Sequence, residues 1–97
     1  MKKEDIKAIQ RRVDEILYYL WDPIGVKDEP AARSEYSSYA ATISSILLAE
    51  KDQESIAKQL MIFERDNMGL VPTDEQHAME IAIILIKAKN AIQEGQS

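Results

Sequence analysis

Apolar residues recur along most of the chain at spacings of three or four, the repeat of an amphipathic α-helix. Four such segments are expected, at about residues 4–20, 33–50, 53–67 and 74–93. In the first segment the apolar stripe consists of Ile6, Ile9, Val13, Ile16, Leu17 and Leu20. The sequence therefore predicts an all-α fold, a single-domain four-helix bundle formed by residues 1–97.

A turn signal ends the first helix. Asp22, Pro23 and Gly25 have the order that a type I turn prefers, because aspartate accepts backbone N–H bonds and proline presets φ. The connection from this turn to the second helix is about a dozen residues long, which is unusual in a compact bundle. We expect Trp21 to pack this connection against the bundle, with Glu35 accepting an N–H bond from the turn or from the indole.

The second helix is expected to direct Tyr36 and Tyr39 inward, while its other side carries small residues. The helical phase leaves three large apolar residues outside the core, namely Tyr18, Leu48 and Ile62. Exposed single apolar residues are common on protein surfaces. Each of the three is therefore interpreted equally well as ordinary surface and as part of an interface.

The later helix ends carry capping signals. Asp52 is expected to cap the third helix, and Gly69 is expected to end it. Thr73 and Gln76 have the spacing of a capping box, which predicts that the fourth helix starts at Asp74. Apolar residues surround most of that helix between Ile81 and Ile86, as in a helix that is central or lies at an interface.

The charge balance restricts the class of partner. The 97 residues carry 12 basic and 17 acidic groups, a net charge of −5, and residues 34–97 hold ten of the acidic groups. Acidic chains repel phosphate backbones, so no direct nucleic-acid binding is expected, and a cationic protein partner fits better. Neither a signal-peptide core nor a membrane span is recognisable, which predicts a cytoplasmic protein with no membrane partner.

The sequence offers little for catalysis. It has no cysteine and one histidine, His77, which has only Glu80 near it on the expected helix. A closed metal site needs more ligands than these two, so no metal, cofactor or catalytic residue is predicted and the protein is not expected to be an enzyme. A ligand site built from Trp21, Glu35, Tyr36 and Tyr39 is the least favoured alternative.

Several motifs resemble those of a group of small bacterial helical proteins. They are the run Trp21-Asp22-Pro23-Ile24-Gly25-Val26, then Pro30, Glu35-Tyr36, Tyr39 and Met68-Gly69-Leu70. This "WDPIGV" type is similar to immunity proteins that neutralise contact-dependent growth inhibition toxins. The resemblance implies that the motif residues anchor the loop to the fold. This loop-anchoring set comprises Trp21, Asp22, Pro23, Gly25, Glu35, Tyr36 and Tyr39.

The leading hypothesis is therefore a bacterial immunity protein that binds the C-terminal domain of a cognate toxin. The resemblance implies a cationic nuclease as the toxin, whose basic cleft an acidic surface would occlude. The residues expected to bind it are Tyr18, Leu48, Glu50, Asp52, Glu54, Ile62 and Asp66. The alternative is a homodimeric structural or adaptor protein without catalytic activity, favoured by the apolar fourth helix.

Overall fold

The part of the chain that the structure describes contains four α-helices and no strand. The computed structural model describes residues 3–21, 30–69 and 73–95. The helices are α1 (Lys3–Ile16), α2 (Pro30–Leu48), α3 (Gln53–Ile62) and α4 (Glu75–Gln93). Two π-helical turns extend α1 and α3, namely η1 (Leu17–Trp21) and η2 (Phe63–Asn67). The predicted all-α four-helix fold is confirmed.

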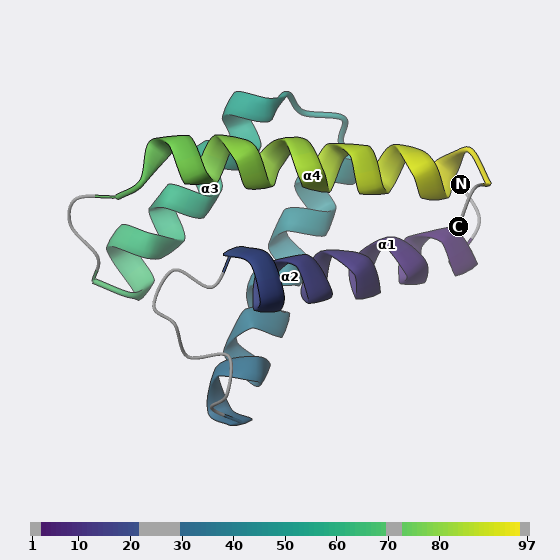
Figure 1. Ribbon diagram of the computed structural model, residues 1–97. Coiled ribbons are helices and arrows are strands. Elements are labelled where there is room, and N and C mark those ends of the chain that lie inside the picture. Colours follow the sequence, from purple (N-terminus) through teal and green to yellow (C-terminus); the bar gives the residue numbers. More distant parts are fainter. Residues whose placement is uncertain (1–2, 22–29, 70–72, 96–97) are drawn as a thin grey trace.

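The helices form a small bundle in which α4 contacts each of the other three helices and lies in front of α2 in the view of Figure 1. Helices α1 and α4 lie side by side and antiparallel, and α2 crosses behind them at a steep angle. Helix α3 packs along the first half of α4. All four helices contribute to one apolar core, whose largest members are Trp21, Tyr36, Ile9, Ile16, Leu17, Ile43, Leu47, Ile56, Leu60 and Leu85.

Helix α2 begins at Pro30, three residues before its predicted start. Proline suits the first turn of a helix because its φ is preset and the missing N–H would have no intrahelical partner. The connection between η1 and α2 is therefore shorter than predicted, comprising residues 22–29. Those residues lie outside the described part of the chain, and with them Asp22, Pro23, Gly25 and the predicted turn.

The turn η1 changes which residues of the first segment face the core. A π-helical turn contains more residues than an α-helical turn, so it shifts the phase of the positions that follow. Leu17 and Trp21 are buried, whereas Leu20 is 51% exposed. Tyr18 packs against the core with its ring 6.1 Å from that of Tyr36. The predictions that Leu20 lies in the core and Tyr18 outside it are wrong, because they extended the α-helical period through this turn.

The helix caps agree with the sequence at two sites and differ at a third. Asp52 caps α3 by accepting a 2.9 Å bond from the Ser55 N–H. Gly69 follows η2 with φ +70°, a conformation that glycine adopts without strain. At α4 the cap is Asp74, which accepts a 3.0 Å bond from the His77 N–H. The predicted cap at Thr73 is one residue too early, since the Asp74 carboxylate takes this role.

We expect Leu17→Ala to lower the free energy of unfolding by about 3 kcal/mol, because it leaves a cavity in a closely packed core. The matched variant Leu20→Ala, three residues later, removes an exposed side chain. It should change the free energy of unfolding by less than about 0.5 kcal/mol. Urea denaturation followed by circular dichroism measures both. Equal losses for the two variants would show that the first helix continues with an α-helical phase.

Candidate functional site

A buried carboxylate joins the two π-helical turns. Glu64, in η2, is 2% exposed. Its Oε2 accepts a 3.1 Å hydrogen bond from the indole N–H of Trp21, in η1, and its Oε1 accepts a 3.4 Å bond from the backbone N–H of Asp74. Burying a carboxylate costs free energy unless donors compensate. The two bonds supply donors and tie the end of the first helical segment to the start of α4.

His77 adds a second link to the same junction. Its Nε2 lies 3.1 Å from the backbone carbonyl oxygen of Trp21. Because a carbonyl oxygen only accepts, this contact is a hydrogen bond when Nε2 carries the proton. The indole of Trp21 thus bonds to η2 and its carbonyl to α4. Two donors were expected for Glu35. The Trp21 indole donates to Glu64 instead, and the turn that was the other expected donor lies outside the described residues.

The aromatic members of the loop-anchoring set are packed together. Trp21, Tyr36 and Tyr39 are buried, with the Trp21 ring centroid 5.7 Å and 6.0 Å from those of the two tyrosines. Tyr39 stacks on Phe63 at 4.4 Å. Glu35 is exposed and accepts a 2.6 Å bond from the Tyr39 hydroxyl. Burial and this neighbouring carboxylate both raise the pKa of the Tyr39 phenol, so the hydroxyl remains a donor.

Three of the predicted partner-binding residues lie close together in the chain at the turn between α2 and α3. Glu50, Asp52 and Glu54 are all exposed there. Hydrogen bonds from Ser55 hold the pKa of Asp52 below its ordinary value. This carboxylate therefore stays ionised at neutral pH. Together the three residues place negative charge at one end of α3.

Glu50 occupies an unfavourable backbone position. It has φ 58°, in the left-handed region. The N–H of Glu50 bonds to the Leu47 carbonyl and that of Lys51 to the Ile46 carbonyl, the pattern of a Schellman motif. Glycine is the usual residue at this position because a Cβ adds strain. A glutamate here also places negative charge at the carboxyl end of α2, where the helix dipole disfavours it.

The remaining predicted partner-binding residues are distributed around the molecule. Leu48 is half-buried and packs against the core, so the prediction that it lies outside is wrong. Ile62 is half-buried at the end of α3. Asp66 is exposed in η2 and pairs with Arg65 at 2.9 Å, which lowers the pKa of its carboxyl. Glu54 lies in the first turn of α3 and Asp66 lies 12 positions later in η2, so the two carboxylates are near opposite ends of this helical segment.

A groove between α3 and α4 contains Glu54 and has an apolar floor. It has a volume of about 540 Å³ and is lined by Glu54, Ala57, Lys58, Met61, Glu75 and Met79. We call it the α3–α4 groove. Ala57 is buried, the two methionines are half-buried, and the charged side chains are exposed. Methionine side chains are flexible and adapt to the shape of a partner, so the floor suits an apolar anchor and the carboxylates suit cations beside it.

Sequence reasoning identified one of the six residues that line this groove. Its α3 members are residues 54, 57, 58 and 61, and its α4 members are residues 75 and 79, all at helical spacings of three or four. Each set therefore lies on one side of its helix. That periodicity was available in the sequence. The pairing of the two sides was not, because it depends on how α3 packs against α4.

The structure and comparisons give three further findings. In the described part of the chain, no three His, Asp or Glu side chains converge as metal ligands would. None of the described helices has the length and apolar content of a bilayer span. Comparisons with protein-family models, curated proteins and solved structures find no match to this chain.

We expect Glu64→Gln to lower the free energy of unfolding by about 1–3 kcal/mol, because the NH2 of the new amide faces either the Trp21 or the Asp74 N–H, which then has no acceptor. The control Glu80→Gln, on the exposed side of α4, should change the free energy of unfolding by less than about 0.5 kcal/mol. Denaturation followed by tryptophan fluorescence measures unfolding at this junction, since Trp21 is the sole tryptophan. An unchanged midpoint for Glu64→Gln would mean that this carboxylate does not stabilise the junction.

Proposed function

We propose that this protein is an immunity protein that binds and neutralises a cognate toxin domain, without catalytic activity of its own. The carrying observation is the α3–α4 groove, in which Met61 and Met79 form an apolar floor between Glu54 and Glu75. Protein interfaces commonly combine an apolar centre with a polar rim. The groove has both features and lies next to the negative charge of Glu50 and Asp52 along the chain.

The proposed partner surface is cationic. Glu50, Asp52, Glu54 and Glu75 are exposed carboxylates on the turn before α3 and on the two helices of the groove. Lys58 is the basic residue among the groove's lining residues. Complementary charge accelerates encounter and favours the correct partner. A nuclease domain suits this surface, because its cleft must be basic to hold a phosphate backbone.

The backbone at Glu50 gives independent support. A glutamate occupies a left-handed position that favours glycine, and its charge opposes the dipole of α2. Residues held in such conformations concentrate at functional sites, where the local cost is offset by a gain in activity. We infer that the gain at Glu50 is contact with the toxin. The proposed interface therefore extends from the α3–α4 groove to the turn between α2 and α3.

Co-expression with the C-terminal domain of the large protein encoded immediately upstream tests the function. Growth rescue and co-purification are expected for the unchanged chain. Glu54→Lys should weaken the complex about tenfold by placing a cation against a cationic partner. The control Glu94→Lys makes the same charge change at the exposed end of α4 and should bind normally. A toxic domain that kills regardless of co-expression would refute the immunity proposal. Equal binding of the toxin by Glu54→Lys and Glu94→Lys would show that the α3–α4 groove is not the binding site.

Glu50→Gly separates stability from recognition. Removing the left-handed strain should raise the free energy of unfolding by about 1 kcal/mol, while losing the carboxylate should weaken toxin binding. Glu50→Gln is the matched control, because it removes the charge and keeps the side chain at a positive φ. It should weaken binding with less gain in stability. Denaturation and titration calorimetry measure the two quantities, and a stabilised Glu50→Gly that binds at full strength would place Glu50 outside the interface.

A further inference from the structure

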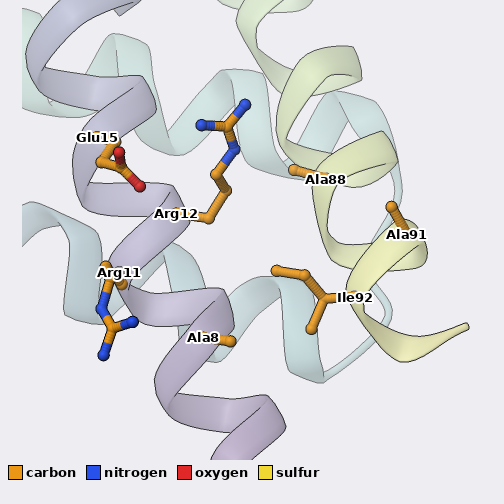
Figure 2. Close-up of a pocket in the computed structure, with 7 residues that line it drawn as sticks. All are labelled: Ala8, Arg11, Arg12, Glu15, Ala88, Ala91 and Ile92. Atoms are coloured by element: carbon orange, nitrogen blue, oxygen red, sulfur yellow. The ribbon is translucent and has the colours of Figure 1, made fainter. Parts of the chain in front are cut away.

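A second groove lies between α1 and α4, toward the other end of α4 (Figure 2). It has a volume of about 430 Å³, and it is lined by Ala8, Arg11, Arg12, Glu15, Ala88, Ala91 and Ile92. We call it the α1–α4 groove. Three alanines and one isoleucine make its floor apolar, and short side chains there allow a second helix to approach closely. On α4 its nearest member, Ala88, is about 14 Å from Met79 of the α3–α4 groove.

Charged side chains of both signs border the α1–α4 groove. Arg12 extends from α1 into the space beside α4 (Figure 2). Glu15 is three residues further along and lines the same groove. Among the described residues neither Arg12 nor Glu15 has an ion-pair partner within 4.0 Å. Both signs of charge are therefore available to a second molecule.

Apolar surface continues beyond the groove on α4. Ile84 is 38% exposed and lies four residues before Ala88, so the two share one side of the helix. An exposed isoleucine beside an apolar floor, with charges along the rim, matches the anatomy of a protein interface. The face thus has a centre that favours burial and a rim that sets orientation.

We propose that this face binds a second copy of the chain, with α1 packed antiparallel against α1 of the other copy. In a two-fold symmetric interface every contact occurs twice. An axis passing midway between positions 12 and 15 of α1 places Arg12 of each copy beside Glu15 of the other. Because it carries charges of both signs, the rim of the groove is complementary to the same rim on a second copy. A rim with charges of one sign would repel its copy.

Charge and size agree with this occupant. Two chains of net charge −5 repel each other on average, but the α1–α4 groove carries two arginines and one glutamate. It is thus a place where two acidic chains can approach. A stable interface needs about 800 Å² from each partner. The two larger extents of the molecule are 38 Å and 29 Å, so the face that contains α1 and α4 is wide enough.

Sedimentation equilibrium of the full chain over a range of concentrations tests the proposal. The expected result is a mass that rises from one chain to two. Arg12→Glu and Glu15→Arg should each raise the dimer dissociation constant about tenfold, because each replaces two attractive pairs by two repulsive ones. The double variant Arg12→Glu with Glu15→Arg restores opposite charges at both pairs. It should return the constant to near that of the unchanged chain.

Two controls make the result specific. Lys58→Glu reverses a charge in the α3–α4 groove and should leave the dimer dissociation constant unchanged, and circular dichroism checks that every variant is folded. A mass of one chain at all concentrations would overturn the proposal. So would a dimer that both single reversals leave intact, or a double variant that stays monomeric. Toxin binding is measured separately, so failure here leaves the immunity proposal untouched.

Discussion

The described structure depends on the carboxylate of Glu64. A carboxyl group that is 2% exposed is unfavourable in a protein interior unless its oxygens have hydrogen-bond partners. Here one donor is the indole N–H of Trp21, 43 residues earlier in the chain, and the other is the backbone N–H of Asp74. Because Asp74 caps α4, the carboxylate also lies near the positive end of the α4 dipole. One side chain therefore fixes where three elements meet.

The junction also accounts for the position of the aromatic residues. Trp21 is the last residue of η1, and its ring contacts Tyr36 and Tyr39 on α2 and Phe63 on η2. Its polar N–H needs a partner once the ring is buried. Glu64 provides it, while His77 bonds to the Trp21 carbonyl. The indole thus packs in the core and is oriented by polar contacts on two sides.

Local sequence information predicted the elements whose causes are local. The apolar period located four helices, Asp52 was recognised as a cap, and Gly69 as a helix end, because each signal acts within a few residues. Glu64 illustrates the limit. It follows Ala57 and Leu60 at helical spacing, so its phase points inward, yet burial of a glutamate at that phase needs the donors that Trp21 and Asp74 supply from distant parts of the chain. No pattern near residue 64 contains those partners.

The π-helical turns were missed for a related reason. Intrinsic propensities do not distinguish an α-helical from a π-helical turn, and the choice depends on the packing that each turn permits. In η1 the turn brings Leu17 and Trp21 to the core together and leaves Leu20 exposed. Both π-helical turns in the described part of the chain contribute to the Trp21–Glu64 bond, since Trp21 ends η1 and Glu64 lies in η2. The error at Tyr18 and Leu20 therefore arises in a segment whose end makes a long-range contact that no local pattern contains.

The core also determines which surfaces remain for recognition. Helix α4 buries Ala78, Ile81, Ala82 and Leu85 along one side, and its neighbours α1 and α3 flank that side. Each flank leaves a groove, one toward α3 with a methionine floor and one toward α1 with an alanine floor. Their rims differ because acidic residues predominate after residue 33 and arginines lie on α1. The two proposed partners, a cationic domain and a second copy of the chain, would therefore bind toward opposite ends of α4.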